Sequence, residues 1–288
     1  MSEKKVTAFT ILQKKKSEKI VMVTAYDYPG ALLAEKAGVD IILVGDSAGM
    51  VVLGYDSTIP VTMDEMILLS RAVARGARRP MIVGDMPFLS FHVNPEEAVR
   101  NAGRFVKEGG VDAVKIEGGA DYEETVRAIR KAGIPVMAHI GLLPQSATLW
   151  SGYRVQGRTA EEAWRLVEDA KAMERAGAFS IVLELVTNEA ARLVSETVAI
   201  PTIGVGAGPH CDGQVLVYHD LLGLYDRIRP KFVRRYLDLS KQIEEALKAY
   251  RGDVLAGTFP AEENSYHMAE EEAVKLESRG GEKEGPLR

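Results

Sequence analysis

The sequence predicts an α/β protein built as a single (β/α)8 TIM barrel, with an extra helix before the barrel and further helices after it. Eight short apolar, β-branched segments recur along the 288 residues, with helical patterning between them. Each segment is almost continuously apolar, which is typical of strands covered on both faces. The alternation is unbroken, and VTAYDYPG follows the first strand where a doubly wound open sheet would need a phosphate loop. The barrel is therefore favoured over the open sheet.

The predicted strands share short length and β-branched composition. In chain order they are Ile20–Ala25, Val39–Val44, Pro80–Val83, Val111–Ile116, Ile134–Ala138, Ala178–Leu183, Ile200–Val205 and Gln214–Tyr218. Several of the helices between them end at a glycine directly before the next strand, as in KEGGVDAV, RKAGIPVM and ERAGAFSI.

Four of the intervening helices have a recognisable first turn. In each, a capping residue stands three positions before an acidic residue, so that both side chains can satisfy free backbone N–H groups. The pairs are Thr62 with Glu65, Asn94 with Glu97, Asp121 with Glu124, and Thr159 with Glu162.

Helices are also expected at both ends of the barrel. The segment Val6–Lys14 is predicted to cover the N-terminal end of the barrel, and the run Lys14-Lys15-Lys16 is interpreted as a solvated helix face. After Gly223, residues 227–254 have a helical pattern. We expect one barrel domain over residues 1–276 and a disordered, glycine-rich and charged tail over residues 277–288.

Composition narrows the possible functions. With 46% hydrophobic residues, the chain can bury a sizeable core, and its net charge of −5 argues against a nucleic-acid partner. It has one cysteine, no signal-peptide pattern and no apolar run of roughly 18 residues. We therefore expect a cytoplasmic protein without a membrane segment.

Polar residues gather where the predicted strands end, which is where (β/α)8 barrels carry their catalytic groups. Taken singly, an aspartate after a strand is more often a turn former or helix cap, and a Lys–Glu pair is often a structural ion pair. Lys115 and Glu117 are two residues apart and so point to the same face of their strand. The full set is Tyr26, Asp27, Asp46, Ser47, Asp85, Lys115, Glu117, His139 and Glu184.

Three carboxylates of this set indicate a cation. Asp46, Asp85 and Glu117 would repel one another at one barrel mouth unless a cation neutralised them. All-oxygen ligation without a His/Cys cluster suits Mg²⁺. The stretch IGVGAGPHCDGQ lacks dinucleotide-binding spacing, and it either lets the backbone approach a ligand or makes a tight turn.

Seven motifs together resemble the ketopantoate hydroxymethyltransferase family, in consistent order from about Thr7 to about Tyr266. They are TAYDYP, GDSAGMVVLGYDST, VGDMPFLSF, VKIEGG, AHIGLLPQS, GYRVQGRT and IGVGAGPHCDGQVLVYHDLLGL. The resemblance implies a (β/α)8 barrel that transfers a one-carbon unit from 5,10-methylenetetrahydrofolate to 3-methyl-2-oxobutanoate. The product would be 2-dehydropantoate, for pantothenate and coenzyme A biosynthesis, formed through a Mg²⁺-stabilised enolate.

The resemblance also implies roles for individual residues. Mg²⁺ would be held by Asp46, Asp85 and Glu117, and the keto acid would chelate that metal. Glu184 would accept the proton. Substrate-binding positions are implied at Asp46, Ser47, Asp85, Lys115 and His139.

The chain departs from the family pattern at four places, none of them a proposed metal ligand, namely Leu69, Leu143, Leu185 and Thr187. The resemblance further implies a homo-oligomer, commonly a decamer of stacked pentameric rings. An alternative function is a Mg²⁺-dependent lyase, aldolase or mutase that acts on a 2-oxo acid in a similar barrel without a pterin carrier. A non-catalytic ligand-binding relative is a second alternative, against which the retention of the polar set argues.

Overall fold

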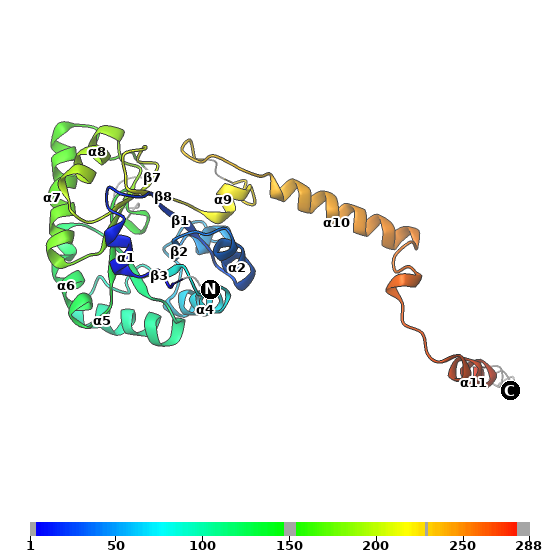
Figure 1. Cartoon of the computed structure of the whole chain (residues 1–288). Coiled ribbons are helices and arrows are strands. Elements are labelled where there is room, and N and C mark those ends of the chain that lie inside the picture. Colours follow the sequence, from blue (N-terminus) through cyan, green and yellow to red (C-terminus); the bar gives the residue numbers. More distant parts are fainter. Residues whose placement is uncertain (1–3, 147–153, 228–229, 281–288) are drawn as a thin grey trace. The chain divides into compact units, whose positions relative to one another are not determined.

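A closed barrel of eight parallel strands forms the centre of the protein, as the sequence predicts. The computed structural model describes residues 4–146, 154–227 and 230–280. Each strand pairs with the next along the chain, and the last pairs with the first (Figure 1). The strands are β1 Ile20–Thr24, β2 Ile41–Val44, β3 Met81–Asp85, β4 Ala113–Glu117, β5 Val136–Gly141, β6 Ser180–Glu184, β7 Thr202–Val205 and β8 Gly213–Leu216.

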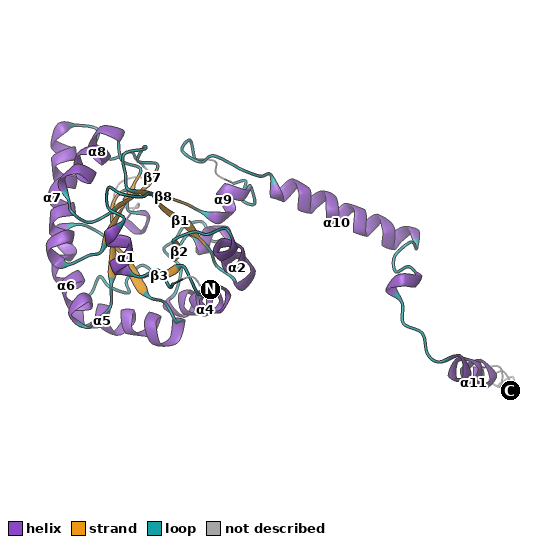
Figure 2. Cartoon of the chain, in the orientation of Figure 1, coloured by secondary structure: helices purple, strands orange, loops and turns teal. Residues whose placement is uncertain are grey.

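Helices lie around the outside of the strands (Figure 2). In the first part of the chain they are α1 Ala8–Gln13, α2 Tyr28–Lys36, α3 Ala48–Val51, α4 Met63–Gly76, α5 Pro95–Arg104, the π-helical turn η1 Phe105–Gly109 and the 3₁₀ turn η2 Ala120–Tyr122. They continue with α6 Glu123–Lys131, α7 Ala160–Ala176, α8 Asn188–Thr197 and α9 Tyr218–Leu222. Three of the four expected caps are confirmed, because the side chains of Thr62, Asn94 and Thr159 each accept the backbone N–H three residues on.

The fourth expected cap, Asp121, is wrong. Asp121 lies inside η2, and α6 begins only at Glu123 with no side-chain cap. The preceding turn is held from outside instead, because the Ala120 N–H donates to Asp169 of α7 at 2.9 Å. A tertiary contact has therefore replaced the local cap that the spacing suggested.

Side chains alternate between two apolar cores. Outward-facing strand residues pack with the helices in one cluster, which includes Ile42, Val114 and Ile181. Inward-facing residues fill the lower barrel in a second cluster, which includes Met81 and Met137. This alternation has a period of two, so the next inward positions along each strand point into the mouth of the barrel.

Helix α1 closes the N-terminal end of the barrel, as expected. Ile11 is fully buried in the interior cluster. The interpretation of the lysine run as a solvated face is wrong for two of its members: Lys14 Nζ pairs with Asp40 at 2.6 Å and Lys15 Nζ with Asp212 at 2.7 Å. Each aspartate directly precedes a strand and also accepts a backbone N–H from a neighbouring strand. Asp40 accepts from Val21 of β1, and Asp212 accepts from Thr202 of β7.

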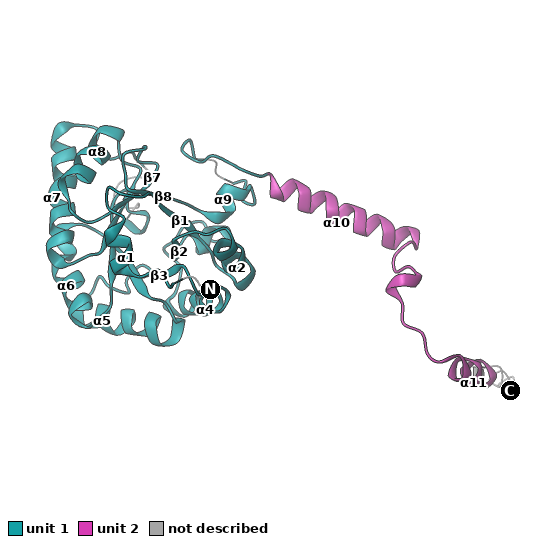
Figure 3. Ribbon diagram, viewed as in Figure 1, with its two compact units in different colours: residues 1–237 teal, residues 238–288 magenta. Residues whose placement is uncertain are grey.

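The chain divides into two compact units, Met1–Leu237 and Asp238–Arg288 (Figure 3). The second contains α10 Leu239–Ala256 and α11 Glu270–Gly280. The helix expected over residues 227–254 therefore begins only at Leu239. Of the tail expected to be disordered, residues 277–280 are helical, and residues 281–288 lie outside the described residues. The domain boundary at residue 276 stays a prediction. No helix of the described segments has the length and apolarity needed to span a bilayer.

Candidate active site

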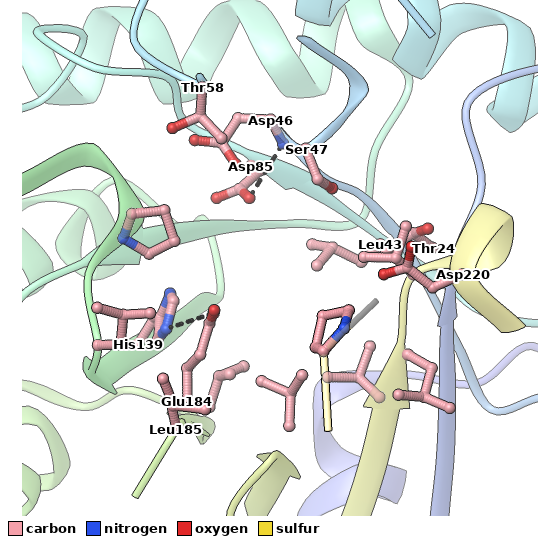
Figure 4. A pocket seen from close by; sticks show the side chains of 18 of the residues that line it. Thr24, Leu43, Asp46, Ser47, Thr58, Asp85, His139, Glu184, Leu185 and Asp220 are labelled. Atoms are coloured by element: carbon pink, nitrogen blue, oxygen red, sulfur yellow. Dashed lines mark hydrogen bonds and ion pairs between the residues drawn. The ribbon is translucent and has the colours of Figure 1, made fainter. Parts of the chain in front are cut away.

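The C-terminal ends of the strands open into a cavity of about 430 Å³ (Figure 4). Polar side chains line one part of it and apolar side chains the rest. The polar and charged lining residues are Thr24, Asp46, Ser47, Thr58, Asp85, Lys115, Glu117, His139, Glu184, Asp220, Tyr225 and Lys231. All seven residues assigned a site role from the sequence are in this lining.

Strand alternation explains why these side chains meet. In β4, Ala113 belongs to the interior apolar cluster, and the next inward positions are Lys115 and Glu117. In β5, Met137 is followed in the same way by His139. The site is therefore the uppermost layer of the barrel interior, in which charged residues replace the apolar ones below.

A buried ion pair forms the centre of the polar part. Lys115 Nζ donates to Asp85 Oδ1 at 2.5 Å and lies 3.9 Å from Glu117 Oε1, with all three side chains almost completely buried. The Asp46 backbone N–H donates to the other carboxylate oxygen of Asp85 at 3.2 Å. Burial by itself disfavours an ammonium ion, but the three surrounding carboxylates outweigh it and raise the pKa of Lys115. Lys115 is therefore a permanent cation.

Gln145 ties the carboxylates together and was not identified from the sequence. Its backbone N–H donates to Glu117 Oε2 at 3.0 Å, and its side-chain amide donates to Asp46 Oδ2 at 2.9 Å and to the Met86 carbonyl at 3.0 Å. Gln145 is 1% exposed and lies in a 3₁₀ turn shortly after β5. Gln145 follows the strand rather than belonging to it, so strand periodicity could not identify it as a site residue. The only sequence feature that pointed to it was its place in the GLLPQS motif.

His139 lies between two carboxylates. Its Nδ1 is 3.4 Å from Glu117 Oε1 and its Nε2 is 3.2 Å from Glu184 Oε2, as the dashed line to Glu184 in Figure 4 shows. Both contacts are ion-pair distances, and neither ring nitrogen makes a hydrogen bond within the described residues. Burial and the Lys115 charge oppose protonation, but the two carboxylates prevail and raise the pKa of His139 to about 9. An imidazolium between Glu117 and Glu184 is the stable form near neutrality.

Backbone geometry fixes the position of Glu184. Gly141 in β5 has φ +97°, and a Cβ there would lie 2.4 Å from the Glu184 carbonyl oxygen, so only glycine permits the two strands to approach this closely. Leu185, one residue later, also has a positive φ of 49°. This conformation is costly for a branched residue. It is held by backbone hydrogen bonds from Leu185 to Val205 and from Gln156 to Leu185.

The buried carboxylates have more negative charge than the two cations balance. Burial and mutual repulsion raise the pKa of Asp46 well above its usual range, and burial raises that of Asp85. For Glu117, the contacts with His139, Lys115 and the Gln145 N–H outweigh burial and lower the pKa. Protonation, or a further cation, would relieve the repulsion between Asp46 and its neighbours.

The donor set fits a hard divalent cation in chemistry and charge, since carboxylate oxygens are the ligands that Mg²⁺ prefers. Asp46, Asp85 and Glu117 all line the same cavity. Among the described residues, however, no three His, Cys, Asp or Glu side chains are already arranged to hold an ion. Lys115 and Gln145 occupy these carboxylates instead, so ion binding would require the side chains to turn.

Two other candidates from the strand ends have structural roles. Asp27 accepts the Gly30 N–H and caps α2, which is the ordinary role of such an aspartate. The Tyr26 hydroxyl is 2.8 Å from Ser47 Oγ, so Tyr26 supports a cavity residue from behind. Gly206 of the glycine-rich stretch has φ +66°, and a Cβ there would lie 2.8 Å from the ring of Phe232. The close approach that this loop permits is therefore to Phe232, which lines the cavity.

The departures from the family pattern are spread over the site region. Leu185 lines the main cavity. Leu143 lines a neighbouring cavity of about 620 Å³, whose wall also includes Arg154 and Arg158. Leu69 and Thr187 are not among the lining residues of either cavity.

Comparison with known proteins gives a consistent result. Residues 5–262 match the model of the family described as ketopantoate hydroxymethyltransferase. A protein named 3-methyl-2-oxobutanoate hydroxymethyltransferase from Syntrophomonas wolfei is 56% identical over 264 residues, covering 92% of this chain and 96% of the relative. One of the same name from Moorella thermoacetica is 57% identical over 253 residues, covering 88% and 94%.

Solved structures with a similar fold are more distant in sequence. A 2,3-dimethylmalate lyase, described as a PEP mutase/isocitrate lyase superfamily member, has a TM-score of 0.57 at 20% identity, covering 96% of this chain and 99% of that one. A phosphonopyruvate hydrolase in complex with oxalate and Mg²⁺ has a TM-score of 0.59 at 12% identity, covering 95% of each chain. At these identities the similarity establishes the barrel fold alone.

Proposed function

This chain belongs to the ketopantoate hydroxymethyltransferase family, and from that premise we propose that its barrel mouth transfers a hydroxymethyl unit from 5,10-methylenetetrahydrofolate to 3-methyl-2-oxobutanoate. One observation carries the proposal. A buried cluster of carboxylates with Lys115 lines the same cavity as Glu184, whose partner His139 joins it to that cluster. A 2-oxo acid needs both parts, because its anion must be held and its C–H bond must lose a proton.

Binding of the keto acid falls to Lys115 and the residues around it. The ammonium group attracts the carboxylate and keto oxygens of a 2-oxo acid, and Asp85 fixes its direction through the 2.5 Å contact. Mg²⁺, held by Asp46, Asp85 and Glu117, would supply Lewis-acid stabilisation of the developing enolate. Ser47, whose hydroxyl is oriented by Tyr26, gives a further hydrogen-bonding group at the cavity wall.

Proton removal falls to Glu184. The hydrogen on C3 of the substrate is weakly acidic, so a carboxylate placed at the cavity wall acts as the general base. His139 Nε2, 3.2 Å from Glu184 Oε2, holds that carboxylate in position at the cavity wall. The proton moves from C3 to Glu184, and the electron pair of the C–H bond enters the enolate.

Carbon–carbon bond formation completes the reaction. The enolate carbon bonds to the methylene carbon of the donor, and water adds the hydroxyl oxygen to that carbon as its two bonds to nitrogen break. The two nitrogens take up two protons, one from protonated Glu184 and one from the water. The products are 2-dehydropantoate and tetrahydrofolate. A cavity of about 430 Å³ is within the usual range for small-molecule sites.

The lyase or mutase alternative is supported only at the level of the fold, since the structures of that kind are 12–20% identical to this chain. Such an enzyme would not depend on a pterin donor. Donor dependence therefore separates the two functions.

The test is an assay of purified protein with 3-methyl-2-oxobutanoate, methylenetetrahydrofolate and Mg²⁺, followed by NMR. We expect 2-dehydropantoate only when all three are present. In deuterated water without the donor, we expect exchange of the C3 hydrogen alone. Turnover of the keto acid without donor, or no product with all components present, would contradict the proposal.

We also propose that the protein is a cytoplasmic homo-oligomer, a decamer of stacked pentameric rings being the arrangement that the family resemblance suggests. Helix α10 buries none of its side chains within its own unit, which supports a packing partner for it.

A further inference from the structure

One carboxylate of the cavity has no part in the chemistry described above. Asp220 lies in the short helix α9 after β8 and lines the cavity. Figure 4 shows it across the view from His139 and Glu184. Within the described residues its carboxylate makes no hydrogen bond or ion pair, although the side chain is half-buried. The nearby Arg235 is engaged elsewhere, with Asp226 at 2.8 Å and the Tyr225 carbonyl at 2.9 Å.

A half-buried carboxylate without a partner is costly. Burial raises the pKa of Asp220 to about 6, because the charge of Arg235 offsets the effect of burial only in part. A ligand that donates hydrogen bonds to this carboxylate would remove the cost. The site is therefore suited to a ligand edge rich in N–H groups.

The wall beside Asp220 suits a flat ring. Val215, Val217, Pro230 and Phe232 line the same cavity as Asp220, together with Tyr225 and Lys231. Phe232 is packed against Gly206, where the missing Cβ lets its ring lie directly on the backbone. Apolar and aromatic walls with a few polar groups are typical of sites for heterocycles.

The opposite charges of Lys115 and Asp220 favour different substrates in different parts of the cavity. A 2-oxo acid presents only acceptor oxygens and a negative charge, so Asp220 repels it and Lys115 attracts it. A pterin presents the opposite pattern on one edge, where its 2-amino group and its N3–H are two neighbouring donors. Two such donors match the two oxygens of a carboxylate in the way a guanidinium does.

We propose that Asp220 binds the 2-amino and N3–H edge of the pterin ring of the one-carbon donor, and so sets the specificity of the cavity for that co-substrate. The inference rests on the proposed function, because it takes methylenetetrahydrofolate as the donor. Asp220 then fixes the orientation of the pterin at the end of the cavity away from Glu184.

The first test needs only the unaltered protein. Tetrahydrofolate and an analogue with hydrogen in place of the 2-amino group are compared by isothermal titration calorimetry in the presence of 3-methyl-2-oxobutanoate and Mg²⁺. Loss of one charge-assisted hydrogen bond should weaken binding about 10–100-fold. Equal dissociation constants for the two compounds would overturn the inference.

The second test assigns the discrimination to Asp220. In Asp220→Asn the negative charge is lost and one of the two acceptor oxygens becomes a donating NH₂ group, so the preference for tetrahydrofolate over the analogue should shrink to within about threefold. Glu184→Gln removes a different carboxylate of the same cavity and should keep the preference of the unaltered protein. A preference that persists unchanged in Asp220→Asn would refute the role of Asp220.

The outcome also separates this inference from the proposed function. A protein that forms 2-dehydropantoate from the folate donor yet does not distinguish the two compounds retains the function and loses the inference. A protein that neither binds tetrahydrofolate nor forms product loses both.

Discussion

Glu184 and His139 form the residue-level contact on which the proposed chemistry depends. Replacement of Glu184 by Gln keeps the size of the side chain but removes its ability to accept a proton. We expect C3–H exchange in deuterated water, measured by NMR without the donor, to slow by about 10²–10⁴-fold. Binding of Mg²⁺ and of the keto acid should persist, because Lys115 and its neighbours provide it. An exchange rate equal to that of the unaltered protein would exclude Glu184 as the base.

Asp85 tests the proposed metal site. Asp85→Asn is preferable to Asp85→Ala, because the amide oxygen can still accept the hydrogen bond of the buried Lys115, which is 3% exposed. Loss of a ligand charge should weaken Mg²⁺ binding, measured by calorimetry. The loss should exceed the roughly 10–100-fold that is typical when a residue hydrogen-bonded to a metal ligand is replaced. Asp112→Asn, at the opposite end of the barrel, is the control and should leave the affinity unchanged. Unchanged affinity in Asp85→Asn would remove Asp85 from the metal site.

The site residues that the sequence predicted have one property in common. Asp85, Glu117, His139 and Glu184 each stand at the end of an apolar strand, so strand periodicity places them at the mouth. Gln145 lies in a short 3₁₀ turn after β5, and its position depends on tertiary contacts that no local pattern reveals. Asp220 lies in a helix of five residues, where sequence gives only a capping or turn interpretation.

At the scale of the element, the segment around α1 is held against the N-terminal end of the barrel by three similar lysine–aspartate ion pairs. Asp40, Asp112 and Asp212 each accept a backbone N–H of a neighbouring strand or of the residue just before it, and each pairs with a lysine of the N-terminal segment. Sequence reasoning failed here because a lysine run is usually solvated. The matching aspartates are 26 and 197 residues away from Lys14 and Lys15 and give no local signal.

Asp212 is the most connected of these groups and gives the element-scale prediction. Its carboxylate pairs with Lys15 and accepts hydrogen bonds from the Thr202 N–H at 2.8 Å and the Lys16 N–H at 3.3 Å. Asp212→Asn leaves Lys15 without its counter-charge at a site where both side chains are about nine-tenths buried. We expect a loss of about 2–4 kcal/mol in the free energy of unfolding, measured with urea.

The pH dependence of this loss has a definite sign. Burial alone would raise the pKa of Asp212, but Lys15 and the Thr202 N–H outweigh it and lower the pKa. A carboxyl with a lowered folded-state pKa stabilises the protein above its unfolded value of about 3.9, and this contribution disappears as the pH falls through the folded value. The difference between Asp212→Asn and the unaltered protein should therefore be largest above pH 5 and shrink below pH 4. Asp64→Asn, which alters an exposed pair with Arg104, is the control and should show no such trend. A difference that does not vary with pH would contradict the assignment.

At the scale of the whole molecule, the barrel was predictable because eight apolar strands and their intervening helices each carry a strong local pattern. The C-terminal part was less predictable. Residues 227–254 show helical composition throughout, yet the helix starts only at Leu239, after Pro230 and an irregular segment. The helical composition of this segment therefore did not locate the first residue of the helix.

Helix α10 gives the last prediction, which concerns assembly. Its apolar residues Ile243, Leu247, Tyr250 and Val254 recur at spacings of four, three and four, which places them on one face, and none of them is buried within its own unit. An apolar face of this kind is unfavourable in water unless another apolar surface covers it, and we expect a second copy of the chain to do so. Light scattering after size exclusion should therefore give a mass several times the 31.4 kDa of one chain. Leu247→Asp should lower that mass, because it puts a charge into the apolar face, whereas Ala249→Asp puts the same charge away from that face and should not. A monomer for the unaltered protein at working concentration, or equal masses for the two variants, would rule out this face as the interface.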